Sequence, residues 1–506
     1  MERLKISDAR LKAIFCSVAI GMIIAHGVAL FNKFAIHDEL MALFNLGVEM
    51  EVGRWGLTFL RHLVYVFFGK NESFSLLSMP LITGLYGFFF ISIAVFRIVK
   101  MLDIKSPEVC ALLGLVFVTY PFMAILFAFN FVAAYYTFAF YLSVLGAYWI
   151  CCVPKKTAFW GGIFAIVFSL SIYQAFFPIT LSMILIYMMK EVYDQKELTI
   201  KAFFLKGLVR LGACAAAVAI YLLINTLCSY FSGVELRNYQ AINQMGQEGL
   251  LYLKRIKVVY SDFFNPAPSF RLHTLFLYQT MLFLCSVLQL ARLKDETPEK
   301  ASKILFLTIL FPLAVNFIYI MCPHDDSYFY RIVNLSVWCG HLMVFVLFAF
   351  LADQPAVREK RALRKAGYVC FALMALMSCR IDNMCYFQAT FRQQRMISYF
   401  TTLITQIKNA EGYKDEYPVV YLNEFGKNDS SVRDMPTLEP AIPPYWGTRW
   451  AISSYAWKEF MSYWCAYAPV PADKRVFEKL PEVQAMPHYP DDGSIKVVNN
   501  TVVVKF

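Results

Sequence analysis

Two adjacent carboxylates, Asp38 and Glu39, follow a long hydrophobic segment at residues 13–34 of this 506-residue chain. A basic stretch at residues 1–12 precedes that segment, which predicts a cytoplasmic N-terminus. The carboxylates then emerge on the far side of a membrane, at the level of the lipid headgroups. Carboxylates are costly to remove from water, and one held at this depth can act as a general base on a substrate hydroxyl. The alternative is that both are solvated loop acids.

Further polar residues are predicted to lie on the same outer side as the acidic pair. They fall in the first outer loop, at the tip of a helical hairpin and between two late hydrophobic segments: Arg54, Tyr173, Gln174, His324, Asp325 and Arg331. Arginine guanidinium groups bind phosphate oxygens in a bidentate manner, and tyrosine and glutamine side chains bond to sugar hydroxyls. Polar groups gathered on one face indicate a binding site more strongly than scattered ones do.

Each of these groups also has an ordinary structural interpretation. Arg54 beside Trp55 is typical of an anchor at the membrane interface. Tyr173 and Gln174 could satisfy backbone groups released by Pro178. The acidic loop that contains Asp325 could bind a divalent cation, but such loops are usually solvated, so we predict neither a metal nor another cofactor.

Composition identifies the setting of these residues. The chain is 59% hydrophobic and 16% charged, whereas soluble domains carry roughly 25% charged residues. The net charge of +11 is concentrated in short loops between apolar segments, which is the positive-inside pattern and not a nucleic-acid-binding surface. The sequence therefore predicts a polytopic protein of the lipid bilayer with no nucleic-acid partner.

The hydrophobic pattern predicts about eleven membrane crossings and an all-α domain over residues 1–380. An odd number of crossings places the C-terminus outside the cytoplasm. The expected crossings are 13–34, 79–98, 109–129, 131–152, two short helices within 157–190 that meet at Tyr173–Pro178, 207–231, 273–291, 304–322, 332–352 and 366–380.

Two outer loops complete the transmembrane domain. The first, residues 35–78, contains an apolar stretch at Trp55–Gly69 that is expected to lie in the membrane interface. The second, residues 232–272, contains a basic amphipathic helix at Leu250–Phe264, and its Lys257 is a candidate ligand for a lipid phosphate.

From residue 381 the composition becomes that of a small extracytoplasmic α/β domain. Pro418–Asn423 is expected to form a buried strand, and a turn at Asn499–Asn500 to join two strands as a hairpin. A group of aromatic residues could stack on carbohydrate or form the core of the domain: Trp446, Trp450, Trp457, Tyr463 and Trp464. Three cysteines could lie outside and pair: Cys379, Cys385 and Cys465.

Several of these motifs resemble the phage-type O-antigen glucosyltransferase II family. The similar parts are the acidic pair after the first span, Gly53-Arg54-Trp55, the stretch Ser169–Gln174 and the C-terminal stretch 486–506. The resemblance implies a bacterial glycosyltransferase of fold class C. It also implies an undecaprenyl-phosphate glucose donor, used on the extracytoplasmic side without a nucleotide sugar.

By the same resemblance Asp38 matches the catalytic acid of the first loop, Arg54 the arginine of the Gly-Arg-Trp motif, and Tyr173–Gln174 the family's tyrosine-glutamine pair. Glu39, which we expect to act as a second acid or to orient Asp38, departs from the usual Asn-Asp-Asp pattern. We therefore expect hexose transfer, with glucose as the sugar, from a polyprenyl phosphate to a surface glycan. A lipid-linked oligosaccharide flippase or other transporter, and a surface-glycan polymerase, are the alternatives.

Overall fold

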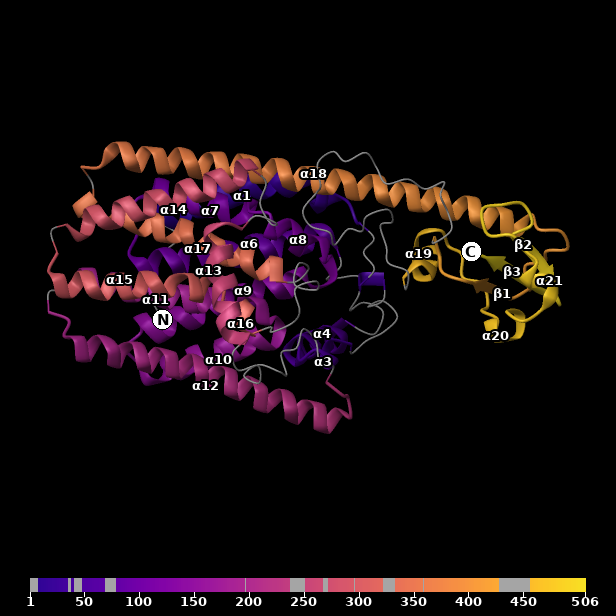
Figure 1. The fold of residues 1–506 in the computed structure, drawn as a ribbon, viewed down its shortest axis with the longest axis horizontal. Helices are drawn as coiled ribbons and strands as arrows, with labels where there is room; N and C mark the ends of the chain where they lie inside the picture. Colours follow the sequence, from indigo (N-terminus) through magenta and orange to yellow (C-terminus); the bar gives the residue numbers. More distant parts are fainter. Residues whose placement is uncertain are drawn as a thin grey trace. The chain divides into compact units, whose positions relative to one another are not determined.

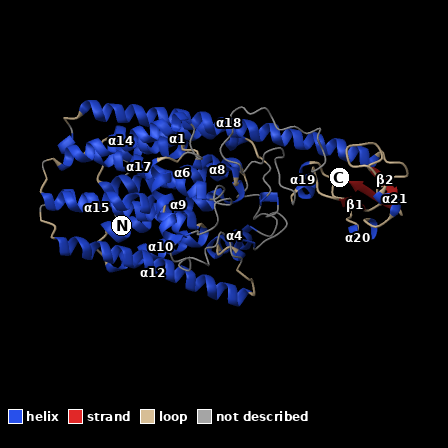
Figure 2. Ribbon diagram, viewed as in Figure 1, coloured by secondary structure: helices blue, strands red, loops and turns tan. Residues whose placement is uncertain are grey.

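The computed structural model of the protein describes residues 8–34, 38–40, 48–68, 79–195, 197–236, 251–266, 272–294, 296–321, 333–357, 359–426 and 456–506. The chain divides into two compact units. We call residues 1–33 with 47–383 the membrane unit, and residues 34–46 with 384–506 the C-terminal unit. Apart from three strands in the C-terminal unit, the regular structure of the described residues is helical (Figure 2).

The membrane unit is a set of helices that run largely side by side (Figure 1). Their bounds are α1 Ala9–Phe31, α3 Val48–Glu51, α4 Trp55–Phe68, α6 Pro80–Leu102, α7 Pro107–Thr119, α8 Phe122–Ala128, α9 Asn130–Cys152, α10 Lys156–Ile172, η1 Gln174–Phe176, α11 Phe177–Asp194, α12 Ile200–Ser232, α13 Leu251–Phe264, α14 Leu272–Leu293, α15 Pro298–Val315, α16 Ile318–Met321, α17 Val333–Asp353 and η3 Pro355–Val357. The next helix, α18 (Arg361–Lys408), belongs to this unit up to Asn383 and to the C-terminal unit from Met384.

Every predicted crossing coincides with at least one of these helices. Seven helices among the described residues are long and apolar enough to span a membrane, or eight if the bent pair α7–α8 is one span. The helices Lys156–Ile172 and Cys339–Asp353 are apolar but shorter. The polytopic helical class is thus confirmed, whereas eleven crossings and the orientation of the termini stay predictions.

Local sequence signals explain where the helices begin and bend. The Asp8 and Ser106 side chains accept hydrogen bonds from backbone N–H groups in the first turns of α1 and α7. Pro121 follows α7, and the chain turns by 45° into α8. Pro178 was expected to break a helix, but it occupies the first turn of α11, where proline is well tolerated. The predicted meeting of two helices at Tyr173–Pro178 is confirmed.

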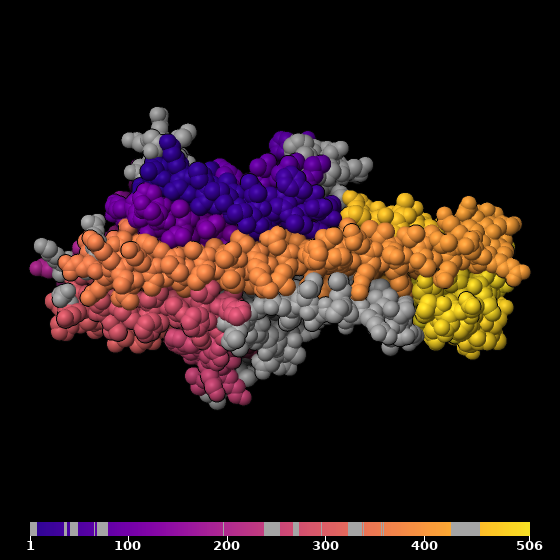
Figure 3. All heavy atoms as spheres, turned by 90° about the horizontal axis from the view of Figure 1, so that it is seen from above, coloured from indigo at the N-terminus to yellow at the C-terminus, as the bar shows by residue number. Residues whose placement is uncertain are grey.

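The last long helix, α18, extends much further than the predicted span 366–380. It continues to Lys408 because buried residues keep a helical spacing beyond residue 380, including Met396, Phe400 and Leu403. Its first part lies between α1 and α14 in the membrane unit (Figure 3). Asn383 Nδ2 donates to the Ile24 carbonyl at 2.9 Å, and the Asp382 carboxylate lies 3.9 Å from His26 Nε2.

The C-terminal unit contains a three-stranded sheet in the order β1-β3-β2: β1 Val419–Leu422, β2 Ile495–Val498 and β3 Thr501–Lys505. β1 pairs parallel with β3, and β2 pairs antiparallel with it. Asn499 and Asn500 have φ angles of 49° and 55°, as a two-residue type I′ turn requires. The predicted strand at 418–423 and the predicted hairpin are both confirmed.

Aromatic rings fill one face of this sheet. Trp457, in α19 (Trp457–Trp464), is 6% exposed and stacks on Phe425 with ring centroids 5.2 Å apart. Its ring is therefore part of the core and not a surface for carbohydrate, while Trp446 and Trp450 lie outside the described residues. The helices α20 (Lys474–Phe477) and α21 (Pro481–Gln484) adjoin the other face. Among the described residues, no disulfide forms at the three cysteines that could have paired: Cys379, Cys385 and Cys465.

Candidate functional site

Three of the predicted site residues, Arg54, Tyr173 and Gln174, lie in one polar cluster of the membrane unit. Tyr173 ends α10 with an extended backbone, and Gln174 begins the 3₁₀ turn η1. Ser336 of α17 donates a hydrogen bond to the Ala175 carbonyl at 2.7 Å, which fixes this turn. The break between α10 and α11 thus turns two polar side chains toward the loop that carries Arg54.

Arg54 is held by two tyrosines. Its Nη1 donates to the Tyr136 hydroxyl at 3.0 Å, and its Cζ lies 4.8 Å from the centre of the Tyr173 ring. The two tyrosine rings stack on each other with centroids 4.3 Å apart. Stacking and hydrogen bonding with tyrosines fix the orientation of a guanidinium group. The arrangement presents a fixed cation suited to an anionic ligand or leaving group.

Gln174 is the centre of a second set of hydrogen bonds. Its Nε2 donates to the Tyr221 hydroxyl at 2.8 Å and to the Val52 carbonyl at 3.3 Å. The Tyr221 hydroxyl in turn donates to the Gly53 carbonyl at 3.0 Å. Gln174 and Tyr221 are buried, so these bonds fasten the backbone just before Arg54 to α12 and η1.

Gly53 allows this loop to approach so closely. Its φ of +75° lies in the left-handed region, which side chains rarely adopt. A Cβ atom at this position would also stand 2.7 Å from the Tyr221 hydroxyl oxygen. The glycine of the Gly-Arg-Trp motif therefore has a structural reason: it brings the arginine beside the tyrosines.

The acidic pair belongs to the C-terminal unit. Asp38 is exposed, whereas Glu39 is only 2% exposed. The next residue, Leu40, packs in the apolar core that contains Phe400 and Val504. The two carboxylates therefore differ in environment: Asp38 is accessible to a solvent-borne hydroxyl group, and Glu39 is enclosed.

The other predicted residues give a mixed picture. Lys257 is exposed on α13, which coincides with the predicted basic helix. His324, Asp325 and Arg331 lie outside the described residues. No group of three or more histidine, cysteine, aspartate or glutamate side chains in the described ranges could hold a metal ion.

Three further polar residues have partners in the structure that no sequence pattern indicated. Tyr136 and Tyr221 lie within apolar helices, where nothing in the local pattern separates them from core aromatics. Asp262 on α13 accepts a hydrogen bond from the Tyr319 hydroxyl at 3.0 Å, and burial raises the pKa of its carboxyl to about 6. Each depends on a partner more than forty residues away in the chain.

Fold and site together define a polytopic helical membrane protein. Its Arg54 is held by two tyrosines, one of which, Tyr173, lies at the break between α10 and α11. The model of the family described as "Glucosyl transferase GtrII" matches residues 27–351, and the chain belongs to this family. The matched range includes Arg54, Tyr173 and Gln174.

Comparison with curated proteins found no match. Among solved structures, the chain is similar to the oligosaccharyltransferase of Archaeoglobus fulgidus, with 10% sequence identity and a TM-score of 0.35. The similarity covers 81% of this chain and 60% of that protein, so the chain spans about three fifths of its length.

Proposed function

We propose that the protein is a membrane glycosyltransferase that transfers glucose from a polyprenyl phosphate to a cell-surface glycan on the extracytoplasmic side. Membership of the glucosyl transferase family supports the transfer of glucose. The observation that carries the proposal is the Arg54 guanidinium, which is held by Tyr136 and Tyr173 beside the enclosed Gln174. Such a fixed cation suits the phosphate of a leaving group.

An apolar groove in the membrane unit supports a lipid-linked donor. It has a volume of about 410 Å³ and lies between α11, α12 and α15. Its lining is apolar except for Arg210, which pairs with Glu191 at 2.5 Å. A groove of this size and composition suits an isoprenoid chain and offers almost nothing to a nucleotide sugar.

The groove and the Arg54 cluster both adjoin one face of α12. The buried residues of that helix include Arg210, Cys214, Ala217 and Tyr221, which follow a helical spacing. At 1.5 Å per residue, Tyr221 lies about 10 Å along the axis from Cys214, which lines the groove. Phe317, also in the lining, contacts Phe177 at the start of α11 with centroids 5.8 Å apart. We propose that a lipid tail lies in the groove with its phosphate end toward the cluster.

The proposed reaction is a direct displacement at the anomeric carbon of glucose. Asp38 accepts the proton of the acceptor hydroxyl as its oxygen forms the new glycosidic bond. The bond between the anomeric carbon and the phosphate oxygen breaks with inversion, and polyprenyl phosphate leaves with the electron pair. Arg54 and Arg331 stabilise the phosphate, Tyr173 and Gln174 orient the sugar, and Lys257 and the loop with His324 and Asp325 bind donor or acceptor.

A reconstituted transfer assay tests this proposal. The full chain in vesicles receives radiolabelled polyprenyl-phosphate glucose or a labelled nucleotide sugar, together with isolated surface glycan. We expect label in the glycan with the lipid donor alone, and loss of transfer in Asp38→Asn. Glu482→Gln, which changes an exposed acid in α21, is the matched control and should retain full transfer.

A second variant tests the groove. Gly207→Leu adds a side chain to the groove lining beside Met188. It should raise KM for a long-chain donor and leave KM for a short-chain donor unchanged. Full transfer by Asp38→Asn would show that the assigned base is wrong, and movement of lipid-linked sugar across the vesicle without transfer would favour a flippase.

A further inference from the structure

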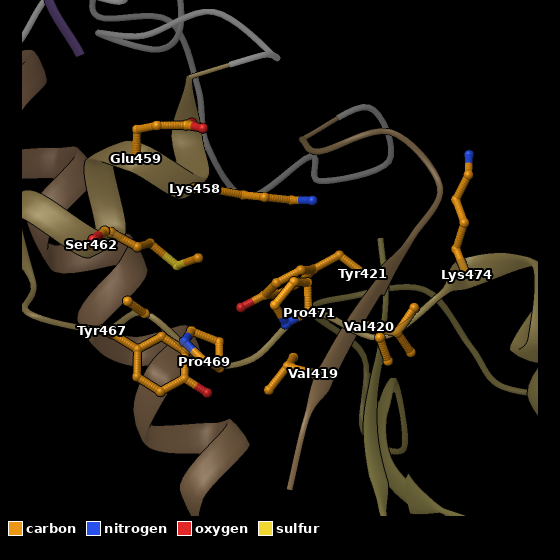
Figure 4. Close-up of a pocket in the computed structure, with 13 residues that line it drawn as sticks. Val419, Val420, Tyr421, Lys458, Glu459, Ser462, Tyr467, Pro469, Pro471 and Lys474 are labelled. Carbon is orange, nitrogen blue, oxygen red and sulfur yellow. The ribbon is translucent and has the colours of Figure 1, made fainter. Parts of the chain in front are cut away.

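A second pocket lies wholly within the C-terminal unit, beside the edge strand β1. Its volume is about 360 Å³, and strand β1, helix α19 and the segment 467–474 contribute its walls (Figure 4). The Val419 N–H donates to the Val470 carbonyl at 2.8 Å, which fixes that segment against the strand. The pocket is therefore formed by ordered backbone on its sides.

Three enclosed polar atoms of residues that line the pocket have no hydrogen-bond partner in the described part of the chain. They are the hydroxyl oxygens of Tyr421 and Tyr467 and one carboxylate oxygen, Oε2, of Glu459. Burial raises the pKa of both tyrosines, so each hydroxyl stays protonated and able to donate. Unpaired polar atoms are costly, so a ligand whose hydroxyl groups displace the local packing and bond to these atoms would be stabilised.

Apolar surfaces and two cations complete the pocket. Pro469 and Pro471 line the pocket together with Lys458 and Lys474 (Figure 4). Lys458 Nζ lies 5.6 Å from the centre of the Tyr421 ring. The lining thus alternates flat apolar faces with hydrogen-bonding groups, unlike the groove of the membrane unit, whose lining has a single charged residue.

This alternation matches the chemistry of a saccharide. A pyranose ring has an apolar face of C–H groups that packs on aromatic and proline rings, and a rim of hydroxyls that donate and accept. A lipid chain would leave the tyrosine hydroxyls and the carboxylate unpaired. We propose that this pocket binds a saccharide unit of the acceptor glycan. That the bound glycan is the acceptor of a transfer reaction rests on the proposed function, whereas the binding of a saccharide does not.

Binding measured apart from transfer tests the pocket. The full chain in nanodiscs is titrated by saturation-transfer NMR with short oligosaccharides cut from the surface polysaccharide of the source cells. Tyr421→Phe with Tyr467→Phe removes two hydroxyls and keeps both rings, and should weaken binding roughly tenfold. Ala468→Trp, which fills the pocket from its exposed side, should abolish it.

Tyr463→Phe is the matched control, since Tyr463 lies on α19 but does not line the pocket. It should bind as the native protein does. If no oligosaccharide binds the native protein, or if the double variant and Ala468→Trp bind as tightly as it does, the inference is wrong.

The transfer assay separates this inference from the proposed function. If both hold, the double variant raises KM for the glycan and leaves KM for the lipid donor and kcat at saturating glycan unchanged. Oligosaccharide binding that the variants abolish, in a protein that transfers no sugar, would retain the pocket and overturn the function. Transfer with an unaltered KM for the glycan would retain the function and overturn the pocket.

Discussion

Tyrosines surround both a cluster in the membrane unit and a pocket in the C-terminal unit, but their hydroxyls are used differently. In the first, Tyr136 accepts from Arg54, and Tyr221 donates to the Gly53 carbonyl. In the second, Tyr421 and Tyr467 have hydroxyls without partners in the described residues. The tyrosine hydroxyls of the first cluster bond to neighbouring protein groups and fix its geometry, whereas those of the pocket could bond to a ligand.

This difference suits two tasks. Stabilising charge in a transition state requires groups that are already in position, because reorganisation during the reaction is costly. Recognising part of a long acceptor requires groups that become satisfied only on binding. This difference is consistent with the proposals of chemistry at the cluster around Arg54 and of recognition at the pocket around Tyr421.

The largest effect is expected on the folding of the C-terminal unit. Trp457→Ala removes a ring that contacts Phe425 at 5.2 Å and Tyr421 at 4.8 Å between centroids. It should cost about 3–5 kcal/mol of stability, measured as the unfolding of this unit by limited proteolysis in denaturant. Tyr463→Ala, on the exposed side of the same helix, should cost much less. If Trp457→Ala were as stable as the native protein, packing against Trp457 would not fix the position of Tyr421.

The largest effect on activity is expected at Arg54. Arg54→Ala should lower kcat by about 100- to 1,000-fold, as removal of one preorganised donor does elsewhere. Arg54→Lys keeps the charge but cannot reproduce both the bond to Tyr136 and the contact with the Tyr173 ring. Its kcat should therefore lie between those of the native protein and Arg54→Ala. Arg475→Ala, at a highly exposed arginine, is the control. Equal activity of the lysine variant and the native protein would contradict the claim that the tyrosines orient the group.

The sequence predicts the positions of the helices better than the contacts between them. The hydrophobic pattern located all the long helices, since twenty apolar residues have few alternatives in a membrane. It missed the end of α18 at Lys408, because the apolar stripe beyond residue 380 is narrow and reads as a soluble domain. The hairpin at Asn499–Asn500 was predictable because its turn depends on two adjacent residues.

The candidate site was predictable only where its residues belong to a short sequence motif. Gly53, Arg54 and the pair Tyr173–Gln174 stand at a loop and a helix break, where polar residues are conspicuous. Tyr221 lies in the middle of a long apolar helix, and only the tertiary contact with Gln174 distinguishes it. Contacts between distant helices follow from packing and not from local pattern.

Gly53→Ala tests whether the loop geometry matters as much as the charge. The substitution places a side chain at φ +75° and 2.7 Å from the Tyr221 hydroxyl, so we expect kcat/KM to fall roughly tenfold, from a backbone cost of about 1–2 kcal/mol together with the clash. Gly233→Ala is the matched control, because Gly233 has φ +67° with open space around it. If both variants lose equal activity, the contact with Tyr221 contributes nothing.

Tyr319 differs from both groups of tyrosines, since its hydroxyl donates to the Asp262 carboxylate at 3.0 Å. Burial raises the pKa of Asp262 to about 6, so the folded state favours the protonated acid. The resulting stability is fully present below the ordinary pKa of 3.8 and is lost as the pH rises through 6. Thermal unfolding of the native protein should therefore show this decline, and Asp262→Asn should flatten it. A decline of equal size in the variant would assign it to other groups.

The smallest effects give the most direct test of the comparison, because the same substitution should act in opposite ways. Tyr221→Phe breaks the bonds to Gly53 and Gln174, and leaves polar groups unsatisfied at a cost of about 1 kcal/mol. Tyr421→Phe removes a hydroxyl that has no partner in the described residues, so without ligand it should be neutral or slightly stabilising. Chemical unfolding of each unit, with and without oligosaccharide, measures both. If Tyr421→Phe lowers the free energy of unfolding as much as Tyr221→Phe does in the absence of a ligand, the Tyr421 hydroxyl already has a hydrogen-bond partner. The pocket would then have no unpaired group to bond to a ligand.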